Sequence, residues 1–226
     1  MTTTPQRSGP FPAPSTQPHR RHNLLIVGAA AVIVVGGAAA VMASRTQHST
    51  DSFAGVSSVV VEVENGNLAI SPAGDDTVTI RTTLNVFLGR LPVADRRLEK
   101  GVLTITSTCP VASMNCYVED ELTVPNGVPV QVRTTTGNVE ATDIDVPEFD
   151  VETVTGQVSA SFVRPPGRIA ISVVTGTVKV TVPAVDYRFD ARTTTGTINS
   201  DVWNNPTAPR TLQLSTVTGT ITATAR

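Results

Sequence analysis

The motif Thr-x-Thr-Gly recurs at a short and nearly constant interval in the C-terminal part of the chain, and this repeat restricts the fold more than any other feature. The motif occupies residues 134–137, 153–156, 193–196 and 216–219, and residues 173–176 carry it with the first Thr replaced. The interval between successive glycines is nearly constant and widens only before the last one, Gly219. An interval of roughly 20 residues is typical of a solenoid, in which each repeat stacks on its neighbours. We therefore predict a β-solenoid.

Apolar and polar residues alternate on both sides of each repeat glycine. The inward positions lie seven and five residues before the glycine and two and four residues after it. In the first repeat they are Val130, Val132, Val139 and Ala141. A period of two is typical of half-buried strands. Each repeat is therefore predicted to consist of two strands that meet at the glycine.

Glycine can adopt a positive φ without a Cβ clash, which suits a corner between two strands. An earlier segment fits the same pattern, because Val59, Val61 and Val63 precede Gly66 at the same spacing. The chain also contains 34 threonines and only 4% aromatic residues, and β-branched side chains favour strands. We predict an all-β domain over residues 56–226, with regular repeats at 130–226. Its corners are Gly66, Gly137, Gly156, Gly176, Gly196 and Gly219.

Residues 24–42 form a run of 19 residues without a charged side chain. A helix of that length spans roughly 28 Å, about the thickness of a bilayer core. Arg7, Arg20 and Arg21 precede the run and give a charge of +3, whereas 14 basic and 19 acidic residues follow it and give −5. Basic residues before a first span favour a cytoplasmic N-terminus. We therefore expect a transmembrane helix over residues 24–43, with the C-terminal domain outside the cell membrane.

A cleaved signal peptide is the alternative, because Val41-Met42-Ala43 before Ser44 resembles a cleavage site. The apolar run is longer than the usual 7–15 residues of a signal peptide, which favours an uncleaved anchor. Both interpretations place the bulk of the chain outside. Residues 1–23 are rich in proline and polar residues, so they are predicted to be a disordered cytoplasmic tail. Residues 44–55 are predicted to be a polar linker.

Cys109 and Cys116 are the two cysteines of the chain, and only a short loop separates them. Outside the cytoplasm such a pair is predicted to form a disulfide. A redox or metal-binding role is the alternative, but no histidine is near in sequence. We expect neither a metal nor a cofactor.

The sequence offers little for catalysis. His48 is the one histidine after the apolar run, which argues against a Ser-His-Asp or Cys-His mechanism. Phosphate-loop, HExxH and EF-hand patterns are not found in it. Carboxylates at residues 75–76, 119–121 and 143–145 could serve a glycosidase or bind Ca²⁺, but acidic clusters at turns are usually solvated. We expect a non-enzymatic protein, and the net charge of −2 argues against nucleic-acid binding.

Two sets of repeat positions contain polar residues of interest. The threonines three and one residues before the glycine are in register with the inward positions, so we expect an internal hydroxyl ladder. The positions directly after the glycine are expected to point outward. They form a candidate surface for a glycan or wall polymer, and the alternative is an ordinary solvated face. This candidate face consists of Asn138, Gln157, Thr177, Thr197 and Thr220.

The repeated segments TTTGNVEA, TVTGQVSA, VVTGTVKV, TTTGTINS and TVTGTITA resemble the bacterial DUF4097-type adhesin family. The resemblance covers residues 56–226 and is strongest after residue 130. It implies an extracytoplasmic β-helix-like domain that is often tethered to a membrane. It implies no catalytic residues for this chain, because the family pattern is a repeat pattern.

These observations together predict a membrane-anchored binding or adhesion module that presents a surface to a cell-wall polymer, a glycan or a protein. A signalling or envelope-stress component that acts through a membrane partner is the alternative, and a glycan-active enzyme is a third. The C-terminal repeat, residues 212–225, is followed only by Arg226, so nothing in the chain remains to cap it. Either this strand folds back against an earlier element of the chain, or its edge is free to pair with another chain. We therefore expect association of copies through this C-terminal rung.

Overall fold

The computed structural model describes residues 44–226, which form twelve β-strands and no helix. The all-β prediction is therefore confirmed. The predicted tail and transmembrane span, residues 1–43, lie outside the described residues. Among residues 44–226, no helix has the length and hydrophobicity required to cross a membrane. The strands are β1 (Arg45–Ala54), β2 (Ser58–Pro72), β3 (Thr77–Val86), β4 (Val93–Glu99), β5 (Val102–Thr108), β6 (Tyr117–Val124), β7 (Val130–Thr136), β8 (Val139–Ile144), β9 (Glu148–Phe162), β10 (Arg168–Val182), β11 (Arg188–Ser200) and β12 (Thr211–Ala225).

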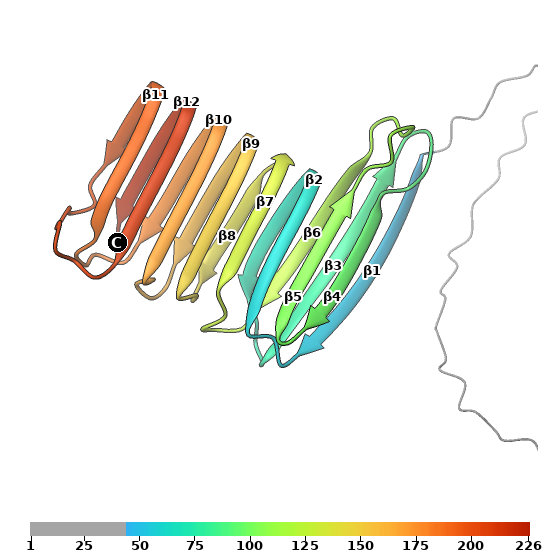
Figure 1. Ribbon diagram of the computed structural model, residues 1–226, viewed down its shortest axis with the longest axis horizontal. Coiled ribbons are helices and arrows are strands. Elements are labelled where there is room, and N and C mark those ends of the chain that lie inside the picture. The colour runs from blue at the N-terminus through green and yellow to red at the C-terminus, as the bar shows by residue number, and fades with distance from the viewer. Residues whose placement is uncertain (1–43) are drawn as a thin grey trace, which may run out of the picture. The chain divides into compact units, whose positions relative to one another are not determined.

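The long strands bend at their repeat glycine, so each has a first arm before the glycine and a second arm after it. We call such a bent strand a rung, and the pairs β5/β6 and β7/β8 each make one rung from two shorter strands. First arms pair with first arms and second arms with second arms, which produces two layers that lie one in front of the other (Figure 1). The buried side chains of both arms form a single core.

Neighbouring rungs from β2 through β11 are parallel and in register. Gly176 of β10 is aligned with Gly156 of β9 on one side and with Gly219 of β12 on the other. Identical repeat positions therefore form rows across the sheet, and the predicted inward rows are buried in β7 to β10 and in β12. Burial of one such aliphatic side chain contributes about 1.5–3 kcal/mol to stability. The repeat pattern thus converts directly into a continuous apolar interior.

The corner brings backbone against backbone. Gly176 has a φ of +151°, in the region that favours glycine. A Cβ built on Gly176 would overlap the carbonyl oxygen of Gly156, and Gly137, Gly156, Gly196 and Gly219 lie against their neighbours in the same way. A Cβ on Gly66 would also meet backbone, at Val118 of β6. A side chain at the corner would therefore separate the rungs.

The order of the last two rungs differs from the order in the sequence. β12 lies between β10 and β11, so β11 is the outermost rung (Figure 1). The expectation that residues 212–225 form the free end of the stack is therefore wrong. The inward residues of β11 are correspondingly less covered, and Ile198 is 40% exposed whereas Ile221 beside it is fully buried. The structure leaves β11, not β12, as the edge.

The first rung in the sequence, β2, lies in the middle of the stack. Its first arm pairs with β5 on one side and β7 on the other, and its second arm pairs with β6 and β8. In the β5/β6 rung, residues 109–116 replace the glycine corner. Cys109 and Cys116 are joined by a disulfide within this loop, which confirms the predicted bond.

Antiparallel strands close the other end of the stack. β3 pairs with β6 and also with β1, and β4 pairs with β5. The prediction of a linker at residues 44–55 is therefore wrong, because residues 45–54 form β1 along the full length of β3. The polar sequence of β1 explains the error. None of its residues is buried, and most are exposed, since the strand lies at the edge of the sheet.

We expect Gly176→Val to lower the free energy of unfolding by about 2–5 kcal/mol, because the side chain combines backbone strain with an overlap against Gly156. Thr177→Ala, one residue away on the outside, should cost no more than about 0.5 kcal/mol. Chemical denaturation of both variants measures the difference. Equal losses would contradict the corner packing.

Candidate binding surfaces

The predicted polar face exists as one continuous row. Adjacent strands align Gln157 with Thr177, Thr177 with Thr220, and Thr220 with Thr197. Asn138 precedes the aligned pair Val139 and Val158, so it lies beside Gln157 at the other end of the row. Asn138, Gln157 and Thr197 are exposed, and the two central threonines are half-buried.

One end of this row bonds the rungs to each other. The side-chain oxygen of Asn67 accepts a hydrogen bond from the backbone N–H of Asn138 at 2.9 Å. Asn138 repeats the arrangement and accepts from the backbone N–H of Gln157 at 3.0 Å. These amide oxygens have a structural partner already. The Asn138 end of the row is therefore a ladder that ties three rungs together.

A second row was not singled out in the sequence, namely the residue two positions before each glycine. Val154, Val174 and Val217 occupy it on the consecutive strands β9, β10 and β12, and they are 47%, 43% and 49% exposed. The pairing registers pass over this position, since the chain turns the corner here. The signal in the sequence was the repeated Val-Thr-Gly, whose valine breaks the polar alternation.

The predicted internal hydroxyl ladder is only half right. Three residues before the glycine, Thr134, Thr153 and Thr216 are buried, as expected. One residue before it, the threonines are exposed, because two successive residues face outward at the corner. The ladder contains one hydrogen bond, from Thr216 to Thr193 at 2.9 Å. Val173 interrupts the row between Thr153 and Thr216, so the hydroxyls do not form a continuous chain.

A trough of about 710 Å³ runs along the corner on the outside of the first arms. It crosses β5, β2, β7, β9 and β10, so it follows the direction in which the rungs stack. We call it the corner trough. In each strand the trough is lined by outward residues, which in the glycine-containing rungs lie four and two positions before the glycine. Inward residues between them complete the lining. The outward residues are Thr106, Thr108, Glu62, Glu64, Arg133, Thr135, Glu152, Val154, Ser172 and Val174.

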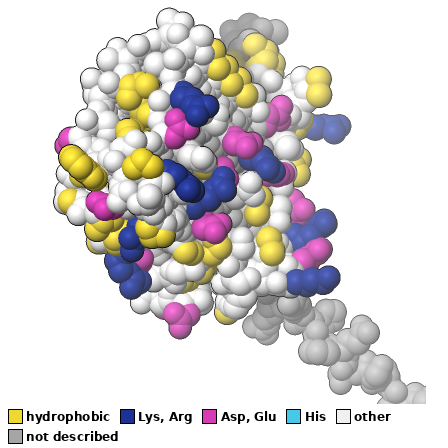
Figure 2. Space-filling model, turned by 60° about the vertical axis from the view of Figure 1, so that its left-hand side comes forward, with side chains coloured by type: hydrophobic (Ala, Val, Ile, Leu, Met, Phe, Trp, Pro, Cys, Tyr) yellow, Lys and Arg dark blue, Asp and Glu magenta, His cyan; other side chains and the backbone are white. Residues whose placement is uncertain are grey.

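Charged side chains lie at the centre and at one end of the corner trough. The guanidinium of Arg133 is 3.7 Å from Glu62 on β2 and 3.4 Å from Glu152 on β9. Glu64 accepts a hydrogen bond from the backbone N–H of Cys109 at 2.9 Å, which places the disulfide loop beside this end. Three carboxylates and one guanidinium give the trough a net charge of −2. On the face shown in Figure 2, charged side chains of both signs are interleaved with hydrophobic ones.

The acidic clusters considered for catalysis are separated into individual contacts. Asp75 accepts from the N–H and hydroxyl of Thr77, which lowers its pKa. Glu121 pairs with Arg81 at 3.1 Å, and hydrogen bonds from Arg226 and Ser161 lower the pKa of Asp143. The described residues contain no group of three or more His, Cys, Asp or Glu side chains that could hold a metal ion.

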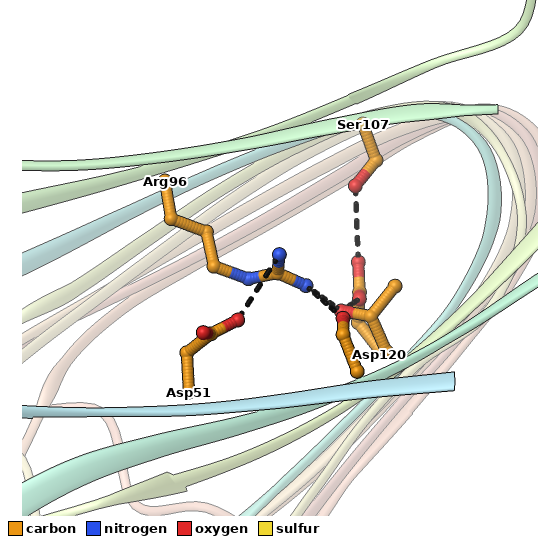
Figure 3. A network of polar contacts seen from close by, with 6 residues as sticks. Asp51, Arg96, Ser107 and Asp120 are labelled. Carbon is orange, nitrogen blue, oxygen red and sulfur yellow. Dashed lines mark hydrogen bonds and ion pairs between the residues drawn. The ribbon is translucent and has the colours of Figure 1, made fainter. Parts of the chain in front are cut away.

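Asp120 departs from the expectation that these carboxylates are solvated. It is 1% exposed and aligns with Leu68, in a row that is aliphatic on the neighbouring rungs. Thr82 donates a hydrogen bond to it at 2.5 Å, and Ser107 is at 3.5 Å (Figure 3). Arg96 donates to the same Thr82 hydroxyl and pairs with Asp51 at 3.2 Å. This polar network joins β1, β3, β4, β5 and β6.

Burial raises the pKa of Asp120, since desolvation of the carboxylate outweighs the hydrogen bonds from Thr82 and Ser107 and the attraction of Arg96. So many polar side chains would be unusual in the middle of an aliphatic core. This network, however, lies at the end of the stack that β1, β3 and β4 close. Proteins built from stacked repeats commonly place polar residues at a terminal repeat, where the interior would otherwise meet water. We interpret the network as the cover of this end of the core.

The comparisons with known proteins support the fold. No protein-family model and no curated protein matches the chain. A solved structure from Clostridium sporogenes ATCC 15579, a "putative cell adhesion protein", aligns with a TM-score of 0.64 at 13% identity, covering 80% of this chain and 100% of that one. A "putative adhesin" from Bacteroides fragilis NCTC 9343 aligns with a TM-score of 0.37 at 13% identity, covering 78% and 97%. The first likeness shows a shared fold and assigns no residue a role.

The raised pKa of Asp120 predicts a pH dependence of stability. Because the folded protein binds this proton more tightly than the unfolded chain does, the contribution of Asp120 to stability falls as pH rises through the folded-state pKa. We expect the melting temperature of the wild type, relative to Asp120→Asn, to increase when the pH is lowered from about 7 to about 4.5. Thermal denaturation of both proteins at each pH measures this.

The remaining carboxylates, including Asp75 and Asp143 with their lowered pKa values, are common to both proteins. Their effects on the pH dependence therefore cancel in the difference. A difference that stays constant over this pH range would show that burial of Asp120 does not govern its titration.

Proposed function

We propose that this chain is a membrane-anchored, extracytoplasmic β-solenoid of the DUF4097-type adhesin family that acts as a non-enzymatic binding module. Its ligand is a polymer or protein outside the cell. The observation that carries the proposal is the corner trough, because it runs across five strands of a single in-register stack. A long shallow site on a rigid sheet suits an extended ligand.

The architecture supports a binding role through its regularity. The rungs β2, β7/β8, β9, β10, β12 and β11 keep one register, and the repeat glycines align from rung to rung. Side chains of the trough are therefore held at the fixed spacing of neighbouring strands, about 4.8 Å. Rigid placement reduces the entropy lost when a ligand binds. The fold shared with a bacterial protein described as a putative cell adhesion protein is consistent with this role.

Chemistry within the described residues supports a non-enzymatic role. His48 lies on β1, where its Nδ1 is 3.0 Å from the Thr83 hydroxyl, and it does not line the trough. The trough carboxylates Glu62 and Glu152 are both engaged with Arg133. An arrangement of a nucleophile with a base, which acyl or glycosyl transfer requires, is not found among the trough-lining residues.

The proposed location rests on the sequence and on the disulfide. The apolar run of 19 residues and the change from +3 to −5 across it favour a membrane anchor with the strands outside. A disulfide between Cys109 and Cys116 is compatible with an oxidising compartment.

The test places the full-length chain in membranes and adds isolated cell-envelope fractions. The amount of each fraction that stays bound to these membranes is measured. We expect one fraction to bind, and the double variant Val154→Ser with Val174→Ser to bind about tenfold more weakly, because apolar contacts in the trough are lost. Val163→Ser is the matched control, since Val163 is 57% exposed but lies outside the trough. It should bind like the wild type.

Two results would contradict the proposal. One is the absence of binding to every envelope fraction while the chain is folded. The other is protection of residues 44–226 from protease added to intact cells, followed by their digestion once the cells are lysed. That result would place the domain inside the cell.

A further inference from the structure

The size of the corner trough restricts the shape of its ligand. The trough crosses five neighbouring strands in the order β5, β2, β7, β9 and β10. Four strand spacings of about 4.8 Å give a length of roughly 19 Å. An extended polypeptide rises about 3.3 Å per residue, so about six residues fit along the trough. A compact ligand would contact only part of it.

The charges restrict the ligand further. Glu62 and Glu152 flank Arg133, and Glu64 lies towards the disulfide loop. The side chains of Glu62 and Glu152 remain 45% and 60% exposed despite their ion pairs, so a ligand can reach them. With three carboxylates against one guanidinium, a cationic ligand is favoured and an anionic one is repelled.

The remaining contacts indicate a polypeptide. Val154 and Val174 give the β9 and β10 end of the trough an exposed aliphatic surface. The lining residues are aliphatic, hydroxyl-bearing or charged, and none offers the aromatic face on which sugar rings stack. Side chains of both kinds, cationic and aliphatic, occur together on a polypeptide.

We propose that the corner trough binds an extended segment of a partner protein in which Lys or Arg side chains occur together with aliphatic ones. The basic side chains lie against Glu62, Glu64 and Glu152, and the aliphatic ones contact Val154 and Val174. This inference rests on the proposed function, since it names the ligand class of the same trough.

The test measures binding of two acetylated nonapeptides to the full-length chain in an uncharged detergent by isothermal titration calorimetry. One peptide is three repeats of Lys-Thr-Val, and the other has Glu in place of each Lys. We expect the basic peptide to bind at least tenfold more tightly than the acidic one. Its affinity should fall as salt is added, because exposed ion pairs are screened.

Variants of the trough test the contacts directly. Glu62→Gln with Glu152→Gln should weaken the basic peptide by about three- to tenfold, and Arg133→Gln should strengthen it by about two- to fivefold. Glu140→Gln is the matched control, because Glu140 is exposed on the second arm, outside the trough. All of these residues are on the surface, so the fold should be retained.

Equal binding of both peptides, binding of neither, or an unchanged affinity in the Glu62/Glu152 double variant would overturn the inference. The proposed function is judged separately by retention of envelope fractions. If a fraction still depends on Val154 and Val174 while neither peptide binds, the module stands and its ligand is not a basic polypeptide. If neither fractions nor peptides bind, both are wrong.

Discussion

The contact between neighbouring corner glycines is the constraint on which the rest of the structure depends. A Cβ built on Gly137, or on any of the four repeat glycines after it, would overlap the carbonyl oxygen of a neighbouring corner glycine. This close approach fixes the register, because a shift by one residue would bring a side chain into the contact and turn every inward residue outward. The buried rows, the asparagine ladder and the corner trough all follow from a register held at this point.

Much of the repeat region could be predicted from the sequence, since local pattern and global packing agree there. Regularly spaced glycines with period-two alternation on both sides give the bent strands and the buried rows. The order of the rungs in space is harder to predict from the sequence. The widened interval before Gly219 and the small or polar Ala191 and Ser200 at inward positions of β11 are the two hints that this rung is the edge. Neither reveals that β12 returns between β10 and β11.

The ends of the stack lack the repeat pattern of its middle. This explains why the predictions for residues 44–55 and for Asp120 are wrong. β1 has a polar sequence because it forms the edge of an antiparallel sheet, so its composition looked like a linker. Asp120 looked like a member of a solvated acidic cluster, but alternation places it inward beside Thr82. Long-range pairing determines both outcomes. A carboxylate in an aliphatic row is tolerated here because Arg96, Thr82 and Ser107 converge on the same end.

The position of β12 has a consequence for the order in which the chain can fold. The rungs from β7 to β10 can add one after another as the chain emerges, because each pairs with the one made just before it. β11 cannot follow this course, since the strand that it pairs with is synthesised after it. β12 must therefore pair with β10 before β11 can dock on it. Until then β11 is an unpaired strand, the kind of segment that is exposed to misassembly during folding. The docking of β11 on β12 is thus the last step in the assembly of this end of the stack.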